Sequence, residues 1–422
     1  MTRGSGLTTA VFVARQPIFH RAKNVHGYEL LFRSGRENRY DGTDDDACTL
    51  DVIATSFSAI GLDELTAGQR GFINFTRSLL LQDVADLLPP DQVTVEVLEN
   101  IEADDDVVAA CKRLKDGGYT LALDDFVLVD PNHRLLELAD IVKIDFAATP
   151  SEERKRVAEF LNGRKIRALA EKVETDEEFQ EAEASGYTYF QGYFFAKPTI
   201  HEGKDVSANN LARLRLLEQM NRPEISVEEI EGIIKQDVAL TYKLLRFINS
   251  AWFGLRHKIS SIRHALVWLG PKEVRKWFAL VSLRDMGTDK PNELFLRAMT
   301  RAKMGESIAP ASAMREQASE LFLMGMFSLM DAILDMPMSE VLTKLPLDDQ
   351  IKTALLGGSC PFRWVHDLIG AYERGNWDTF SEHANQLHLD ENVVPPIFNE
   401  SIRWANQACA CASDSPDDAE DG

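Results

Sequence analysis

The stretch Ile141-Val142-Lys143-Ile144-Asp145 ends an apolar run with a lysine and a carboxylate, and this arrangement recurs through the first half of the chain. Leu121-Ala122-Leu123-Asp124-Asp125 and Ala168-Leu169-Ala170-Glu171 repeat it. Other apolar runs lead to Glu29, Asn74, Glu96 and Gln191. Polar residues placed repeatedly at strand ends are typical of the catalytic face of a (β/α) barrel. So many carboxylates in one place require cations, and Mg²⁺ and Mn²⁺ prefer oxygen ligands.

The first half alternates β-type runs with segments of helical spacing. Strands are expected at residues 11–19, 25–32, 72–75, 93–97, 121–124, 141–144, 166–170 and 189–194, and helices at 48–60, 104–115 and 152–161. Strands separated by helices pair in parallel. Only residues 20–24 join the first two strands, which is too short for a helical crossover, so this pair is predicted to be antiparallel. The predicted fold class is α/β, a modified (β/α)8 TIM-type barrel with an antiparallel first strand pair.

A helix start follows the strand that carries Glu171. Thr175-Asp176-Glu177-Glu178 has the spacing of a capping box, in which Thr175 and Glu178 each bond the other's backbone amide. The chain therefore leaves the strand just after Glu174. This places Glu171 and Glu174 at the carboxyl-terminal rim of the barrel, where catalytic residues gather.

From about residue 205 the apolar residues follow helical spacing, as in Ile230, Ile233 and Ile234. We expect an all-α second domain and a boundary after Pro198, in the polar stretch 199–210. The predicted segments are a flexible N-terminus at 1–10, the barrel domain at 11–200, the helical domain at 201–411, and an acidic disordered tail at 412–422.

Composition narrows the range of partners. The chain has 422 residues, 45% of them apolar, and a net charge of −21. This charge repels nucleic acid and anionic membranes, so neither is an expected partner. The five cysteines show no paired spacing, and no apolar stretch reaches the length of a membrane span. We expect a cytoplasmic protein.

Ordered motifs in both halves resemble those of a known family. The first half has Gln16-Pro17-Ile18, Tyr28-Glu29-Leu30-Leu31-Phe32-Arg33, the runs quoted above, and Gln191-Gly192-Tyr193-Phe194. The second has Pro223-Glu224-Ile225-Ser226, Phe247-Ile248-Asn249-Ser250-Ala251-Trp252-Phe253-Gly254 and Trp268-Leu269-Gly270. The first half resembles the EAL domain, a cyclic di-GMP phosphodiesterase module, and the second resembles the HDOD domain. The pairing is similar to the EAL–HDOD signalling proteins.

The resemblance implies a role for each matching residue. The metal ligands for Mg²⁺ or Mn²⁺ would be Glu29, Asn74, Glu96, Asp124 and Asp125. Lys143 would hold the nucleophilic water and Glu171 would be the general base. Arg33, Gln191 and Glu174 would bind or support the substrate, cyclic di-GMP, and Glu99 would brace the loop after Asp125. The HDOD domain would contact an unknown signalling protein, and a homodimer is compatible with the family.

Two departures from the family pattern leave the activity open. Residues 126–131 lack the two glycines that follow the paired aspartates in the family, and Lys172 stands where the family has glycine. A Lys172 ammonium between Asp124 and Glu171 would occupy a metal position. The alternatives are a domain that hydrolyses cyclic di-GMP, one that only binds it, and a catalytically inactive EAL–HDOD adaptor that acts through protein contacts.

Overall fold

The structure is a computed structural model. It describes residues 11–34, 61–82, 84–125, 134–197, 208–220, 222, 225–249, 253, 258–288, 290–345 and 347–413. The predicted flexible N-terminus, the predicted helix at 48–60, the altered loop at 126–131 and most of the predicted acidic tail lie outside these ranges.

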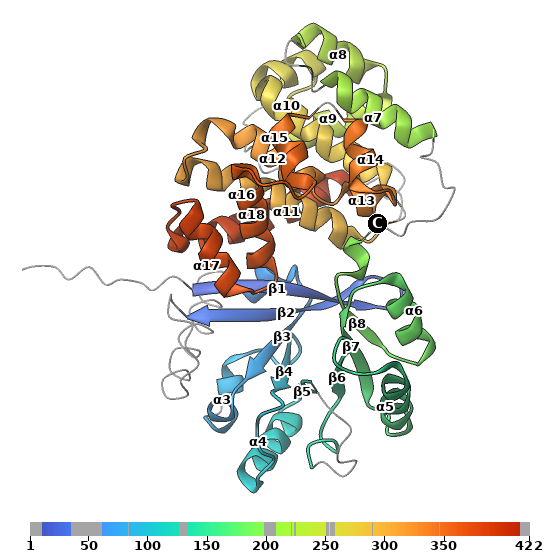
Figure 1. The fold of residues 1–422 in the computed structure, drawn as a ribbon, viewed down its shortest axis with the longest axis vertical. Coiled ribbons are helices and arrows are strands. Elements are labelled where there is room, and N and C mark those ends of the chain that lie inside the picture. Colours follow the sequence, from blue (N-terminus) through green and yellow to red (C-terminus); the bar gives the residue numbers. More distant parts are fainter. Residues whose placement is uncertain are drawn as a thin grey trace, which may run out of the picture. The chain divides into compact units, whose positions relative to one another are not determined.

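The first half closes into a barrel whose strands are hydrogen-bonded in chain order, with the last strand returning to the first (Figure 1). The strands are β1 (Val11–His20), β2 (Val25–Ser34), β3 (Arg70–Phe75), β4 (Val93–Val97), β5 (Thr120–Leu123), β6 (Ile141–Asp145), β7 (Arg167–Val173) and β8 (Tyr189–Gly192). Each overlaps the range expected from the sequence. The predicted barrel is confirmed.

The antiparallel first strand is also confirmed. β1 pairs antiparallel with both β2 and β8, whereas the neighbours from β2 to β8 pair in parallel. The turn at residues 21–24 is too short for a crossover, and it forces β1 to run back along β2. The resulting register sets Gln16 opposite Glu29.

An apolar layer fills the barrel below its carboxyl-terminal rim. It consists of Ile18, Phe72, Ala122, Ile141, Leu169 and Tyr189. Because side chains alternate along a strand, residues two positions apart face the same way. The residues two positions nearer the rim are Gln16, Asn74, Asp124, Lys143, Glu171 and Gln191. A polar ring therefore lies one layer above the apolar one.

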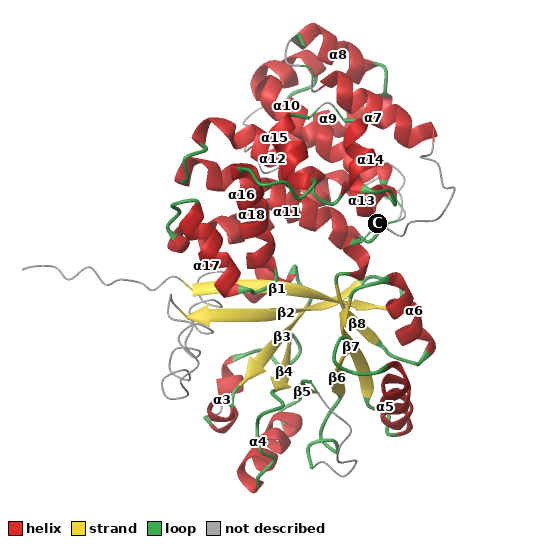
Figure 2. Ribbon diagram, viewed as in Figure 1, coloured by secondary structure: helices red, strands yellow, loops and turns green. Residues whose placement is uncertain are grey.

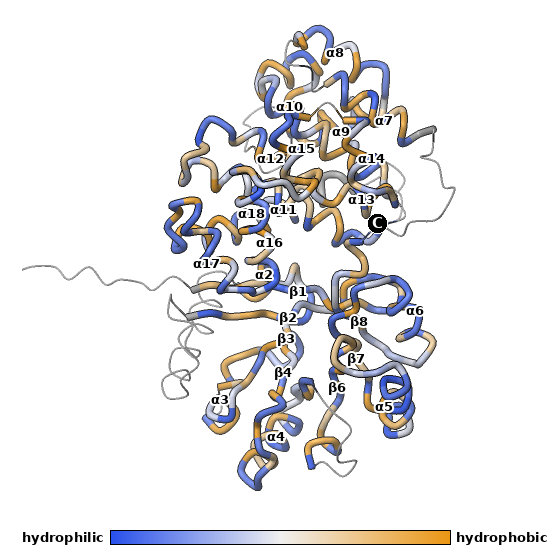
Figure 3. Tube along the Cα trace, viewed as in Figure 1, coloured by the Kyte–Doolittle hydropathy of each residue, from blue (hydrophilic) through white to orange (hydrophobic). Residues whose placement is uncertain are grey.

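Helices follow most of the parallel strands. They are α2 (Leu62–Thr66), α3 (Arg77–Leu81), α4 (Asp105–Asp116), α5 (Ser151–Gly163) and α6 (Asp176–Ala184), with short 3-10 turns at Val84–Leu87 and Phe194–Ala196. α4 and α5 carry both polar and apolar residues (Figure 3), and the apolar ones, such as Val107 and Leu161, are buried. Thr175 and Glu178 form both bonds of the predicted capping box at the start of α6.

The chain divides into two compact units. The first contains residues up to Phe195 and, from much later in the sequence, Gly370–Ser381; the second contains Ala196–Ile369 and Glu382–Gly422. We call Gly370–Ser381 the strap. It takes in the end of α16 (Pro361–Glu373) and the start of α17 (Trp377–Gln386). No pattern in the sequence separated the strap from the helical half.

The second unit consists of helices joined by loops, with no strand among its described residues (Figure 2). Its further helices are α7 (Ala208–Met220), α8 (Val227–Lys235), α9 (Val238–Ile248), α10 (Ile262–Met286), α11 (Asn292–Ile308), α12 (Ala318–Phe327), α13 (Met330–Leu334), α14 (Met338–Thr343), α15 (Asp349–Leu355) and α18 (Val394–Ser413). α10 is kinked at Gly270, where φ is 78°. Of the helices in the described ranges, none has both the length and the apolar character needed to cross a membrane.

The end of β7 contains a bulge that separates two neighbouring side chains. The register with β8 shifts between Ala170 and Val173, and Lys172 has a left-handed φ of 55°. Glu171 is buried, whereas Lys172 is exposed. On β8, Gly192 approaches so closely that a Cβ there would lie 2.0 Å from the Val173 carbonyl oxygen. Because of the bulge, the Glu171 side chain lies inside the barrel and the Lys172 side chain lies outside it.

Paired substitutions of Lys172 test the cost of the left-handed backbone. Lys172→Gly and Lys172→Ala both lose the side chain, but only glycine adopts this conformation without strain. We expect Lys172→Gly to be more stable than Lys172→Ala by about 1 kcal/mol in urea unfolding. Equal stability of the two variants would show that the bulge is not strained.

His26 should make the barrel sensitive to acid. It stacks on Tyr189 with ring centroids 4.3 Å apart. Burial, aided by the charges of His20, Arg70 and Arg167, lowers the pKa of His26 to about 4. The unfolded chain, with a His pKa of about 6.5, binds more protons, so stability falls as the pH drops from about 6.5 towards 4.

Replacing His26 tests this assignment. His26→Gln should reduce the stability lost between pH 7 and pH 5 by about 1 kcal/mol, a value discounted for the partial exposure of the ring. The exposed His264→Gln is the matched control and should behave like the parent protein in the same urea titrations. An unchanged pH dependence in His26→Gln would contradict the assignment.

Candidate active site

The ammonium group of Lys143 lies inside a ring of carboxylates. Its Nζ atom is 2.8 Å from Glu171 Oε1, 2.9 Å from Asp124 Oδ1 and 3.0 Å from Glu96 Oε1. Glu29 Oε1 is 3.6 Å away, and the Lys143 side chain is 0% exposed. Burial alone would lower the pKa of Lys143, but the four carboxylates outweigh it and raise the pKa well above its ordinary value. Lys143, on β6, is therefore held as a cation, and it joins carboxylates from β2, β4, β7 and the end of β5.

Two amide side chains fix Glu29. Gln191 Nε2 donates to Glu29 Oε2 at 2.6 Å, and Asn74 Nδ2 donates to Glu29 Oε1 at 3.2 Å. Burial raises the pKa of Glu29, but the charge of Lys143 and these hydrogen bonds lower it by more. Glu29 is thus held as an oriented carboxylate.

The single positive charge of Lys143 does not neutralise all the carboxylates around it. Burial, which the Lys143 charge only partly offsets, raises the pKa of Glu171 to about 8 and that of Glu96 well above its ordinary range. Burial also raises the pKa of the neighbouring Asp125. Crowded carboxylates with raised pKa values need further positive charge to ionise together.

The oxygens of the ring fit divalent cations. One oxygen from each of Asp124, Asp125 and Glu171 lies within 4.8 Å of the others. Asp125 Oδ1, Asn74 Oδ1 and Glu96 Oε2 are buried and lack a hydrogen-bond donor among the described residues. Buried oxygens without a donor are costly, and hard cations such as Mg²⁺ and Mn²⁺ bind such oxygens. The predicted ligands Glu29, Asn74, Glu96, Asp124 and Asp125 therefore supply the oxygen donors that such cations prefer, and Asp124 and Asp125 lie close together beside Glu171.

Lys172 does not enter the ring. Its Nζ donates to Asp145 Oδ2 at 2.5 Å, and Asp145 Oδ1 accepts the backbone N–H groups of Ala147 and Ala148. The residue that bridges Asp124 and Glu171 is instead Lys143. Lys172 therefore does not lie between Asp124 and Glu171, a place that the Lys143 ammonium takes instead. The other departure from the family pattern, the loop at 126–131, lies outside the described residues.

Three predicted site residues lie apart from the ring. Arg33 is 6% exposed, and its Nη1 donates to Ser381 Oγ of the strap at 3.2 Å. Glu174 is exposed at the start of α6, where its backbone N–H donates to Glu178. Glu99 is exposed, and its charge contributes to the raised pKa of Asp125.

Gln16 belongs to the site, although sequence analysis gave it no role. Its Oε1 accepts a hydrogen bond from Gln191 Nε2 at 3.2 Å. Gln16 lies opposite Glu29 in the antiparallel register, so both side chains face the barrel interior. The alternation in β1, counted back from the buried Ile18, was the signal that could have identified it.

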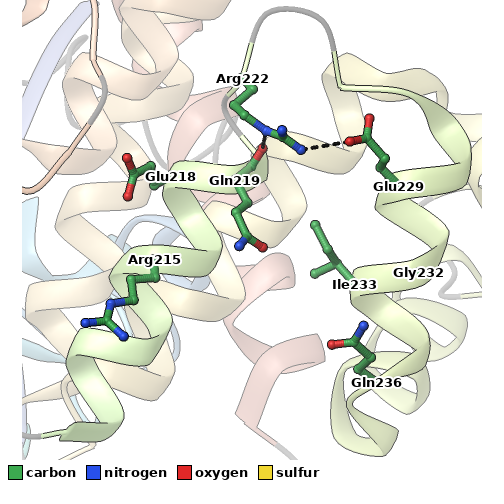
Figure 4. Close-up of a pocket in the computed structure, with 8 residues that line it drawn as sticks. All are labelled: Arg215, Glu218, Gln219, Arg222, Glu229, Gly232, Ile233 and Gln236. Atoms are coloured by element: carbon green, nitrogen blue, oxygen red, sulfur yellow. Dashed lines mark hydrogen bonds and ion pairs between the residues drawn. The ribbon is translucent and has the colours of Figure 1, made fainter.

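The second unit has a surface pocket of its own between α7 and α8 (Figure 4). It measures about 680 Å³ and is lined by Arg215, Glu218, Gln219, Arg222, Glu229, Gly232, Ile233 and Gln236. The Arg222 guanidinium donates to Glu229 Oε1 and to the Gln219 carbonyl oxygen. These hydrogen bonds use two of the five guanidinium N–H donors, and the Arg222 side chain is 54% exposed.

Comparisons with known proteins agree with the order of the two units. The family model of the EAL domain matches residues 50–198, and that of the HDOD domain matches residues 210–340. Among solved structures, Klebsiella pneumoniae BlrP1, in a manganese and cyclic di-GMP complex, is 26% identical, with a TM-score of 0.38; the match covers 46% of this chain and 56% of that one.

Two relatives match nearly the whole chain. YuxH of Bacillus subtilis, an uncharacterized protein, is 37% identical over 94% of this chain and 98% of its own. The cyclic di-GMP phosphodiesterase CdgJ of Vibrio cholerae is 36% identical over 93% of this chain and 92% of its own. The chain belongs to the EAL–HDOD family, in which an EAL barrel is followed by an HDOD helical domain.

Proposed function

We propose that this protein acts in cyclic di-GMP signalling and that its barrel hydrolyses the cyclic dinucleotide to its linear form. The observation that carries the proposal is the ring of strand-end carboxylates around Lys143, complete at every position that the family pattern requires. The name of CdgJ, a relative over almost the full length, supports the same substrate.

The ring supplies the groups that hydrolysis of a phosphodiester needs. Glu29, Asn74, Glu96, Asp124 and Asp125 would hold Mg²⁺ or Mn²⁺. Such a pair of cations activates water and stabilises the oxygens of an in-line phosphoryl displacement.

The remaining residues act on the water and the substrate. Burial raises the pKa of Glu171 to about 8, and the charge of bound cations would lower it, so that Glu171 could accept a proton from the attacking water. Lys143, next to it, orients this water and offsets charge on the phosphate. Gln191 keeps Glu29 in place, and we assign Arg33 and Glu174 to the substrate, with Glu99 supporting the loop after Asp125.

The helical unit is proposed to bind a signalling protein. We also propose that the whole protein works in the cytoplasm, and a homodimer is the assembly to test.

A second candidate function is a catalytically inactive adaptor. The buried position of Arg33 favours this reading, because a phosphate-binding arginine must be accessible. Calorimetry with cyclic di-GMP separates the two, since binding in the presence of Ca²⁺ argues against an adaptor that works through protein contacts alone.

Substitution of the proposed base tests the hydrolase. Purified protein incubated with cyclic di-GMP and Mn²⁺ should release the linear dinucleotide, measured by chromatography. Glu171→Gln preserves the side-chain shape and should lower the turnover by roughly 100-fold or more. Glu177→Gln, at an exposed position on α6, is the control and should leave turnover unchanged. Product formation that survives Glu29→Ala would exclude this site.

Removal of Lys143 tests the metal site through stability. Lys143→Met leaves three buried carboxylates and the partly exposed Asp124 without their cation and should lower the Tm by roughly 10 °C in metal-free buffer. Added Mn²⁺ should raise the Tm of this variant by more than that of the parent protein, because it neutralises the same oxygens. Scanning fluorimetry gives both values. The exposed Lys112→Met should match the parent; an equal Mn²⁺ response in Lys143→Met would contradict the metal site.

A further inference from the structure

We propose that the strap, Gly370–Ser381, withholds Arg33 from the substrate and regulates the barrel by covering or releasing this arginine. The inference rests on the proposed function, because it gives Arg33 a substrate phosphate to bind. It adds that a segment drawn from the C-terminal half of the chain controls access to the site.

Contacts on several sides enclose the Arg33 guanidinium. Its carbon lies 5.4 Å from the centroid of the Phe12 ring and 6.0 Å from that of the Trp377 ring. Its Nη1 donates to Ser381 Oγ at 3.2 Å. Two of these three contacts come from the strap. A phosphate binds arginine through the guanidinium N–H groups, so a guanidinium enclosed in this way must be uncovered first.

β1 and β2 form an antiparallel ribbon, and one face of this ribbon carries Glu29 and Gln16, which point into the barrel. The strap covers the outer part of this same face. Arg33 lies opposite Phe12, and Leu31 opposite Ala14, on the same face as the Glu29–Gln16 pair. At Gly375, a Cβ would lie 2.8 Å from Leu31 Cδ1, so the strap backbone rests directly on the ribbon. The covered face leads from Arg33 to the metal ligand Glu29.

A chain of hydrogen bonds joins the strap to that ligand. Gln16 Nε2 donates to the Arg374 carbonyl oxygen at 3.2 Å, and Gln191 Nε2 donates to Gln16 Oε1 at 3.2 Å. The same Gln191 nitrogen donates to Glu29 Oε2 at 2.6 Å. Movement of the strap would therefore disturb both the phosphate-binding arginine and the partners of a metal ligand.

Aromatic packing anchors the strap. Phe12 meets Trp377 and Phe380 edge to face, with centroids 6.1 and 6.0 Å apart. Tyr372 packs against the same two strap rings at 5.4 Å. At Ile369 and Glu382 the chain passes directly into the second unit. Because the strap is tied to that unit at both ends, a partner that displaces the second unit can pull the strap away.

Two strap variants and one control test the proposal in the full-length protein. Trp377→Ala removes the ring over Arg33, and Ser381→Ala is a milder change that removes only a hydroxyl group. Trp268→Ala, at a residue 47% exposed on α10, is the control. The first readout is the rate at which phenylglyoxal modifies Arg33, followed by peptide mass spectrometry. The second is the KM and kcat of cyclic di-GMP hydrolysis with Mn²⁺.

We expect both strap variants to speed the modification of Arg33 and to lower the KM about five-fold, with little change in kcat. Trp268→Ala should match the parent protein, and the gain should vanish when Arg33→Ala is combined with Trp377→Ala. Unchanged modification rates overturn the proposal, as does a raised KM, which would mean that the strap positions Arg33 for the substrate. An absence of both turnover and binding in every variant would overturn the proposed function and with it the regulatory role, whatever the modification rates.

Discussion

The buried ammonium of Lys143 is the interaction on which the rest of the barrel rim depends. Carboxylates from β2, β4, β5 and β7 meet around it, and each would repel the others without it. When one member of a buried cluster of ion pairs is removed, the remaining charges are left buried without compensation, which strongly destabilises a protein. The lysine also leaves the ring short of positive charge, as the raised pKa values of Glu96 and Glu171 show. The lysine therefore holds the carboxylates together, and the negative charge that it leaves is what bound divalent cations would neutralise.

The alternation of side chains along the strands made the barrel and most of the site predictable. Residues two positions apart face the same way, so an apolar residue such as Ile141 in the buried layer fixes Lys143 in the layer above it. The antiparallel first pair followed from the length of a turn, and the capping box of α6 from the spacing of Thr175 and Glu178. These are local rules, and local rules can be derived from one sequence.

Other features depend on contacts that the sequence does not encode locally. The direction of Lys172 is set by a bulge and a left-handed backbone at the end of β7, so the residue pairs with Asp145 instead of entering the ring. The strap joins the barrel although more than three hundred residues separate Ser381 from Arg33. Periodicity indicated only that this region is helical. The strand predicted at 25–32 stopped one residue short of Arg33, which lies on β2, and the segment that covers Arg33 was not foreseeable.

The central claim is that the ring around Lys143 binds divalent metal, and anomalous diffraction tests it most directly. Crystals grown with Mn²⁺ and measured near the manganese absorption edge should show an anomalous peak within ligand distance of Asp124, Asp125 and Glu171, or of Glu29, Asn74 and Glu96. Electron density without a manganese peak, with Lys143 still in contact with Glu96, Asp124 and Glu171, would contradict the account.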